Sequence, residues 1–540
     1  MCHCGKRSVI PVPSNRHTST FGLTLYSEQP MILSTPLVLG TLVTWITPIW
    51  LLGIGAGLGL VVLLTSWALI AVFSRRLAVS TARSVREGIL WPILVVVFLV
   101  SLISLIATSS LRNPTEILSS LTKLPQVGTT QLLFTLPGPD AEPDSDGYIP
   151  AEETPQEVNF RLKELQRIVI EAPGNITVRT RSEDEKGKTK ILRVAAGEPL
   201  TWFPPVQAGS FFPGEEVTHL YLRNLGTTEV NGTVTIVTEV PYPEVRGIVV
   251  TAVLIAALFL IYLVIQLVAP KAAAIALSTA KSEIAQPMFL VAVSLGIFLL
   301  LIFVFIPYNT FGEDVKVLKD TGLTTIMILS LLVAVYASGT SVAEEIDGRT
   351  ALTVLSKPVS RRQFVLGKFM GILWLVLLVF VILGILFLFM ISYKVVYDAR
   401  ETTNPEPLWQ DCYLEMVSTV PGLALVFMET VVLASLSVAI STRLPLLPNF
   451  VIMFSIYVLG HLTPLIVHSA LLKEFEPVVF VGWLIACAIP VLDHFNIQAA
   501  VAAGVDVPLD YLGWSFVYCV LYSAMALLLA LTLFEDRDLA

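Results

Sequence analysis

The sequence predicts an all-α polytopic membrane protein, with about nine spans and a re-entrant segment, that carries an inserted extracytoplasmic, mainly-β domain. Of its 540 residues, 55% are hydrophobic and only 14% are charged, which is far from the composition of a soluble domain. Uncharged apolar runs of about 20 residues recur, and this length crosses a hydrocarbon core roughly 30 Å thick. One long polar segment, residues 111–246, interrupts these runs.

The chain begins with a polar tail, residues 1–36, and we expect translation to begin at Met31 within it. A Cys-His-Cys triplet near its start has no partner motif, so an unstructured end is favoured over a metal site. The N-terminal membrane spans are expected in residues 37–110.

The apolar stretch 37–73 is too long for one simple span. We expect an interfacial or re-entrant piece that ends at Pro48, a first span at 49–73 and a second at 89–109. Residues 74–88 between these spans carry four arginines. The positive-inside rule therefore places this short loop in the cytoplasm.

Residues 111–246 are predicted to form the inserted domain. A Pro- and acid-rich linker at 137–157 is followed by runs that alternate apolar and polar residues, which indicates short β-strands and a small sandwich. No cysteine lies in this segment, so disulfides do not hold it together. Because the second span runs outward, we expect the domain outside the cytoplasm.

Residues 247–269 are read as a connecting span and residues 270–540 as a second membrane region. A polar stretch at 271–287 is expected in the cytoplasm and outer loops at 311–320 and 392–420. The expected spans are 288–306, 321–342, 369–391, 421–441, 450–468 and 512–533. The apolar segment 478–492 suits a re-entrant helix; if it crosses instead, the C-terminus lies outside rather than in the cytoplasm.

One short stretch contrasts with its apolar surroundings: five basic and three acidic residues lie within positions 343–368. An amphipathic helix is expected to end before Pro358, and Ser360 with Gln363 has the pattern of a capping box for the next helix. Lys368 is expected to extend toward the membrane interface. From composition alone, an ordinary positive-inside loop with a surface helix explains the stretch.

The stretch contains Glu345-x-Asp347-x-x-Thr350, then Leu355-Ser356-Lys357-Pro358-Val359-Ser360-Arg361 and Gly367-Lys368. This run resembles the cytoplasmic-loop signature of ABC-2 type transporter permeases, closest to the branch that includes the permease of nitrous-oxide-reductase maturation systems. The ending Phe534-x-x-Arg537-Asp538-Leu539 resembles that family's terminus as well. The resemblance covers residues 270–540 and not the N-terminal half.

The resemblance implies that residues 343–363 form a coupling loop, which docks on a separate ATPase subunit and transmits its closure. The residues implied to carry this coupling are Glu345, Asp347, Gly348, Arg349, Thr350, Lys357, Pro358 and Arg361. It also implies a permease dimer, homo- or heteromeric, in the plasma (inner) membrane, with the loop in the cytoplasm.

No catalytic motif accompanies these features. A phosphate-binding loop is absent, since Gly187-Lys188-Thr189 lacks the upstream glycine, and no hydrolase or zinc-protease motif occurs. We therefore expect no enzymatic activity, metal or cofactor in this chain, with ATP bound by the partner. A net charge of −8 without a basic stripe argues against nucleic-acid binding.

Two ionisable residues, Glu429 and His461, fall inside predicted spans. A charge in the membrane is costly, so we expect them to pair or to line a substrate path. The alternative is a helix-packing hydrogen bond with a protonated Glu429.

Three classes of function fit the sequence. The first is the permease subunit of an ATP-driven transporter, exporting an unidentified substrate. The second is a mechanotransmitter that acts on an envelope protein through residues 111–246. The third is a membrane assembly protein, in contact with lipid, that uses no ATPase.

Overall fold

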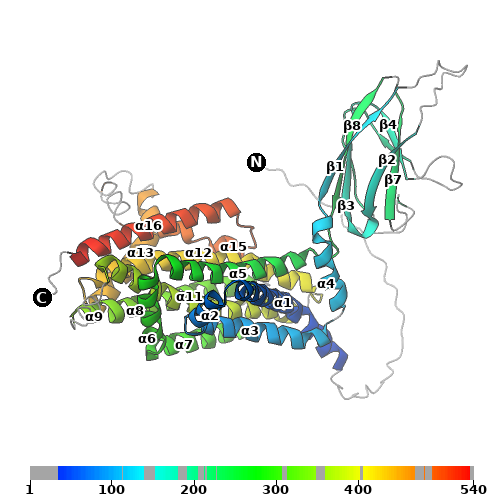
Figure 1. The fold of residues 1–540 in the computed structure, drawn as a ribbon. Helices are drawn as coiled ribbons and strands as arrows, with labels where there is room; N and C mark the ends of the chain where they lie inside the picture. The colour runs from blue at the N-terminus through cyan, green and yellow to red at the C-terminus, as the bar shows by residue number, and fades with distance from the viewer. Residues whose placement is uncertain are drawn as a thin grey trace, which may run out of the picture. The chain divides into compact units, whose positions relative to one another are not determined.

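The fold is that of a bundle of long helices and a pair of small sheets (Figure 1). The computed structural model describes residues 35–111, 113–138, 153–180, 191–204, 212, 216–226, 228–306, 313–347, 359–401, 405–468, 480 and 489–535.

Among these residues, eight helices are long and apolar enough to cross a membrane. They are Leu42–Phe73, Leu90–Ser110, Pro243–Val268, Pro287–Phe305, Asp314–Glu344, Arg361–Glu401, Trp409–Ser441 and Leu509–Glu535. A shorter apolar helix, Leu446–Leu462, lies where another span was predicted. The helical, multi-pass character of the prediction is thereby confirmed.

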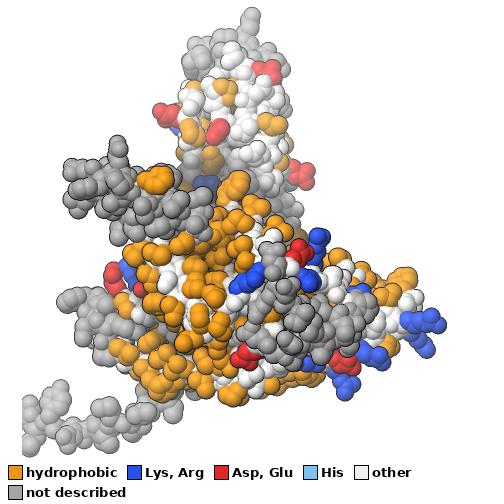
Figure 2. Space-filling model, turned by 90° about the vertical axis from the view of Figure 1, so that its left-hand side faces the viewer, with side chains coloured by type: hydrophobic (Ala, Val, Ile, Leu, Met, Phe, Trp, Pro, Cys, Tyr) orange, Lys and Arg blue, Asp and Glu red, His pale blue; other side chains and the backbone are white. Residues whose placement is uncertain are grey.

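The surface of the bundle agrees with this assignment. Figure 2 shows a broad hydrophobic face with Lys and Arg side chains gathered on one part of it. Large apolar side chains are exposed on several long helices, including Leu64, Leu105, Leu254, Leu290 and Leu521. Apolar surface on this scale is typical of contact with lipid rather than with water.

The first helix is longer than predicted. Helix α1 runs unbroken over Thr35–Phe73 with Pro48 inside it, so the division expected at this proline is wrong. Membrane helices tolerate proline where neighbouring groups satisfy the freed backbone. Near this proline, the Thr47 hydroxyl donates to the Val43 carbonyl at 2.6 Å and the Ser392 hydroxyl donates to the Trp45 carbonyl at 2.8 Å, so side chains add hydrogen bonds to carbonyls in the turn before it.

The helices that follow in this half are α2 (Arg75–Arg86), α3 (Leu90–Ala107), α4 (Pro114–Lys123) and, after the sheets, α5 (Arg246–Val268). Helix α1 packs against α3 and α5 through alternate glycines. A Cβ on Gly53 would lie 2.5 Å from the Ser104 Cβ of α3, and one on Gly55 would lie 2.9 Å from the Ile248 carbonyl oxygen of α5. Gly57 and Gly59 repeat the two contacts one turn later. Two interleaved small-xxx-small patterns thus allow one helix to approach two neighbours closely.

The second half contains α6 (Pro270–Ile284), α7 (Pro287–Phe305), α8 (Asp314–Ser338), the π-helix η5 (Gly339–Glu344) and α9 (Glu345–Asp347). After the charged segment come α11 (Arg361–Glu401), α12 (Trp409–Ser441), α13 (Leu446–His468), η6 (Leu492–Phe495), α15 (Gln498–Ala502) and α16 (Leu509–Glu535). Most of the segment 478–492 lies outside the described residues.

The expected outer loops 311–320 and 392–420 are largely helical, because α8, α11 and α12 extend beyond the predicted spans. Their polar residues pair across the bundle. Lys319 of α8 lies 2.5 Å from Glu415 of α12, and Lys394 of α11 lies 3.2 Å from Asp314 of α8. Both lysine side chains are fully buried, so these ion pairs let the helices continue where the sequence indicated loops.

The two halves share one hydrophobic core. Buried side chains of α1, α3 and α5 belong to the same cluster as those of α8, α11 and α12. Tyr262 of α5 and Trp374 of α11 meet edge to face with ring centroids 5.4 Å apart. Helix α6 fits closely on α11, where a Cβ on Gly367 or Gly371 would lie within 3 Å of an α6 carbonyl oxygen.

Residues between α4 and α5 form two four-stranded antiparallel sheets. The first has the order β1-β8-β3-β6, with strands Thr129–Leu136, Val230–Thr238, Leu165–Glu171 and Leu200–Trp202. The second has the order β2-β7-β4-β5, with strands Thr154–Arg161, Glu216–Asn224, Ile176–Arg179 and Leu192–Val194. Inward-facing residues of both sheets form one core, as a sandwich requires.

The chain enters and leaves these sheets at one point. Strand β1 pairs with β8 so that Thr129 lies opposite Val237, and the Thr238 amide donates to the Gly128 carbonyl at 3.0 Å. Strand β2 begins inside the stretch expected to be a linker, which corrects that boundary.

Candidate functional site

The candidate site lies at the base of the charged segment between α8 and α11. Helix α8 continues into the π-helix η5 and then into the short α9. Such π-helical turns occur frequently at functional sites. The predicted amphipathic helix and the residues Gly348, Arg349, Thr350, Lys357 and Pro358 lie outside the described residues, as does the Asp347 side chain.

An ion pair between a buried lysine and a partly exposed glutamate closes the base of this segment. The Lys368 Nζ of α11 lies 2.6 Å from the Glu345 Oε1 of α9, and the lysine side chain is only 5% exposed. The Phe364 ring lies 5.6 Å from the same ammonium group. The expectation that Lys368 reaches the membrane interface is therefore wrong, because its charge is neutralised inside the protein.

Glu283 of α6 adds a second carboxylate to this pair. The Thr340 hydroxyl of η5 donates to its Oε2 at 2.9 Å. Burial raises the pKa of Glu283 to about 7, although Thr340 and the Lys368 charge lower it. The carboxylates of Glu344 and Glu345 raise this pKa further. The four groups join α6, η5, α9 and α11 in one cluster, which we call the loop-base cluster: Glu283, Thr340, Glu345 and Lys368.

The start of α11 is capped as predicted. The Gln363 amide donates to the Ser360 Oγ, and the Ser360 amide donates to the Gln363 Oε1, each at 3.2 Å. Phe364 is fully buried and its ring stacks on Phe534 of α16 with centroids 5.6 Å apart. The reciprocal cap therefore fixes the exit of the charged segment.

Arg361 has a partner within the chain. Its Nη1 donates to the Glu535 carbonyl at 2.8 Å, and its guanidinium lies 5.8 Å from the centre of the Phe534 ring. A cation is favourable at the C-terminus of a helix, here α16. This residue consequently ties α11 to α16, in addition to any part it has in coupling.

A polar network lies behind η5. The Asn449 amide of α13 donates to Ser338 at 3.1 Å, Ser437 at 2.9 Å and Ser441 at 2.8 Å. The hydroxyls of Ser338 and Ser437 also contact each other. All four side chains are fully buried, so this network fastens the end of α8 to α12 and α13. The sequence does not predict this network, because serine and asparagine inside apolar runs have no distinctive spacing.

The structure brings Glu429 and His461 together, with 3.5 Å between the Glu429 Oε1 and the His461 Nε2. Glu429 of α12 is 1% exposed, and neither of its carboxylate oxygens has a hydrogen-bond partner among the described groups. The His461 Nδ1 lies 3.1 Å from the Tyr457 carbonyl oxygen. Their proximity agrees with the prediction, whereas a role in a substrate path stays a prediction.

One acidic group in the described part of the chain has a spacing that could suit a metal ion. Oxygens of Asp314, Asp398 and Glu401 lie within 4.8 Å of one another. Lys394 already pairs with Asp314 at 3.2 Å. The ammonium group of Lys394 therefore already neutralises one of the three carboxylates.

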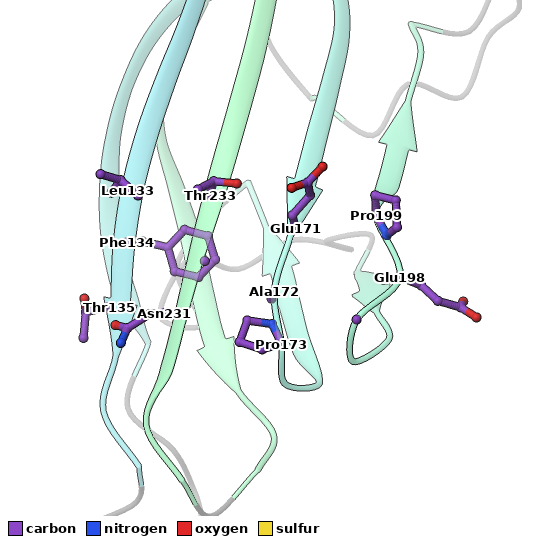
Figure 3. Close-up of a pocket in the computed structure, with 12 residues that line it drawn as sticks. Leu133, Phe134, Thr135, Glu171, Ala172, Pro173, Glu198, Pro199, Asn231 and Thr233 are labelled. Carbon is purple, nitrogen blue, oxygen red and sulfur yellow. The ribbon is translucent and has the colours of Figure 1, made fainter.

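The β-sheets have a hollow of about 850 Å³ beside β1, β3 and β8. Figure 3 shows Leu133, Thr135, Asn231 and Thr233 on neighbouring strands, with Glu171 on the third. Leu133 is 82% exposed. This open, mixed surface has no cluster of catalytic or metal-binding side chains among its lining residues.

No protein-family model matches this chain, and no curated protein matches it. The helical architecture by itself supports a multi-pass membrane protein.

Proposed function

We propose that this chain is the membrane subunit of an ATP-driven transporter of the ABC-2 type. In this proposal a separate ATPase docks on the coupling loop, residues 343–363. The observation that supports it most is the loop-base cluster, in which Lys368 pairs with Glu345 at 2.6 Å and joins the two ends of the segment. A segment anchored at both ends transmits a push from outside as movement of whole helices.

The contacts behind the segment suggest which helices would move. On one side, the loop-base cluster joins η5 to α6 and α11 through Thr340 and Lys368. On the other, Ser338 and Asn449 join the end of α8 to α13. Because these helices are linked by continuous contacts, we expect them to move together. A measured coupling energy between the linked residues would be the proof.

Transport itself would use the region around Glu429 and His461. This pair lies between α12 and α13, the two helices that the Asn449 network fastens to α8. A movement of the loop would therefore reach the pair through contacts within the bundle. Export is the direction that the resemblance favours.

A mechanotransmitter is the second candidate, and the hollow on the β-sheets favours it. An exposed Leu133 beside polar strands offers a surface for an envelope protein. In that case ATP hydrolysis would move the sheets and no solute would cross the membrane. The third candidate is a membrane assembly protein that works without an ATPase, and in that case no ATPase would co-purify with the chain.

Affinity purification of the chain from its native membranes tests the proposal. We expect an ATPase with a phosphate-binding loop to co-purify and the complex to hydrolyse ATP. Arg349→Glu reverses a charge in the coupling loop and should remove both results. Lys316→Glu, which reverses an exposed charge near the start of α8, is the matched control and should retain them.

Two outcomes would overturn the coupling role: no ATPase in the purified material, or equal ATP hydrolysis by the Arg349→Glu and unmodified complexes. If the ATPase is present, proteoliposomes that hydrolyse ATP without moving any tested solute favour the mechanotransmitter. A complex whose hydrolysis rises with one class of solute favours transport.

A further inference from the structure

Helix α2 has an unusual distribution of charge. Its four arginines are Arg75, Arg76, Arg83 and Arg86, and all are exposed. At 3.6 residues per turn they fall within about 100° of the helix surface. None of them forms an ion pair with another described residue. Four guanidinium groups on one arc therefore have no anionic partner among the residues that the structure describes.

An apolar groove of about 410 Å³ lies directly beside this arc. Its walls come from α1, α2, α3 and α5, and Arg86 stands among its lining residues together with Trp67 and Trp91. Ligand sites in proteins typically occupy roughly 300–1,000 Å³. The groove thus combines an apolar interior with a cation at its border.

A second groove of about 370 Å³ lies between α2 and α5. Thr81 and Leu263 line both grooves, so the two lie side by side along α2. A ligand with one charged group and two apolar chains would match this pair of grooves.

Two hydrogen bonds hold α2 in place between the grooves. The Trp67 indole of α1 donates to the Ala78 carbonyl at 3.0 Å, and the Tyr262 hydroxyl of α5 donates to the Ser84 carbonyl at 3.1 Å. Gln266 donates to that hydroxyl at 2.7 Å. The arginines and the groove walls are therefore pre-positioned rather than dependent on a ligand for their arrangement.

We propose that α2 and the two grooves beside it form a binding site for an anionic diacyl phospholipid of the membrane. The phosphate lies at Arg83 and Arg86, and the acyl chains fill the grooves. Guanidinium groups bind phosphate in a bidentate manner, and basic residues at a membrane surface attract anionic headgroups. The tryptophans suit the same level of the bilayer, where amphipathic rings concentrate.

The charge selects this occupant over the others. A zwitterionic lipid would fill the grooves equally well but would leave the arginines without a net counter-charge. A detergent or neutral lipid would fill the apolar grooves but would offer no negative charge to the arginines. A peptide would need hydrogen-bonding partners along its backbone, whereas the first groove is lined mostly by apolar side chains.

Native mass spectrometry of the full chain, delipidated in detergent, tests the site. Phosphatidylglycerol and phosphatidylcholine with identical acyl chains are added in turn. We expect tighter binding of phosphatidylglycerol by at least tenfold. The double variant Arg83→Gln/Arg86→Gln should reduce this preference by up to about 25-fold, the product of two roughly fivefold contributions, so that little or none of it remains.

Lys281→Gln is the matched control, because it removes one exposed cation at the end of α6 and should retain the preference. Ala82→Trp places a large side chain in the first groove and should weaken binding of both lipids. Equal binding of the two lipids by the unmodified chain would overturn the proposal, as would a preference that survives the double arginine change. A co-purified peptide displaced by neither lipid would also overturn it.

Discussion

The variant Glu283→Gln tests how much the buried, ionised Glu283 carboxylate of the loop-base cluster lowers the free energy of unfolding. Glutamine has the shape of a protonated glutamate and can still accept the Thr340 hydroxyl, but it carries no charge at any pH. Because burial raises the Glu283 pKa from 4.5 to about 7, the folded protein holds a proton there that the unfolded chain has lost. Stability is therefore expected to fall as the pH rises from about 4.5 to about 7.

The magnitude follows from the same values. A rise in pKa from 4.5 to about 7 corresponds to about 3 kcal/mol between the protonated and ionised forms. We expect Glu283→Gln to raise the free energy of unfolding by up to about 3 kcal/mol at pH 8.5, and by less than about 1 kcal/mol at pH 5. Unfolding in mixed micelles at both pH values, followed by tryptophan fluorescence, measures the difference.

Glu157→Gln on β2 supplies the control, since this carboxylate is exposed to solvent. Its effect should be small and should not change between the two pH values by the amount seen for Glu283. A Glu283→Gln variant that is destabilised at pH 8.5, or that gains the same stability at both pH values, would refute the reasoning. The first result would mean that the ionised carboxylate is a net stabilising partner of Lys368.

Three further changes test other parts of the structure. Lys368→Met should destabilise by about 1–3 kcal/mol in the same unfolding assay, because it removes the ammonium group beside Glu345, whose side chain is 33% exposed, and adding Glu345→Gln should recover part of the loss. Gly55→Ala should lower stability because its Cβ meets the α5 backbone, whereas Gly513→Ala, with open space around it, should be neutral or stabilising by up to about 1 kcal/mol. Glu429→Leu should leave stability unchanged or raised while abolishing solute-stimulated ATP hydrolysis; unaltered stimulation would argue for a packing role only.

Hydropathy predicted the positions of the membrane helices well, but it predicted the residues at which they begin and end poorly. The apolar centres of α5 and α7 coincide with the predicted spans within one or two residues, because transfer energy dominates there. Helices α8 and α11 extend further, since Lys319 and Lys394 find carboxylate partners on neighbouring helices. A pairing between distant segments leaves no signal in a local window of sequence.

In the candidate site too, features that depend on neighbouring residues were predicted from the sequence, whereas features that depend on distant segments were not. The cap formed by Ser360 and Gln363 depends on residues three positions apart, and the sequence predicted it correctly. Burial of Lys368 depends on Glu345 and on Glu283, which lie on other helices, so the local pattern of the sequence predicted a lysine at the membrane surface instead. The close contacts of the α1 glycines are a further feature of the structure, and alternate glycines within an apolar helix are the sequence signal for them.

The antiparallel pairing of β1 with β8 at the entry to the sheets has a mechanical consequence. Because Thr129 and Val237 lie opposite each other, a pull that separated α4 from α5 would act along the hydrogen bonds of this ladder. The hydrogen bond nearest the pulled end would then bear most of the force, so the bonds would break one after another and not all together. If the sheets convey motion to a partner, a rigid-body rotation of both sheets preserves their fold. A force that pulled their two attachment points apart would instead separate β1 from β8.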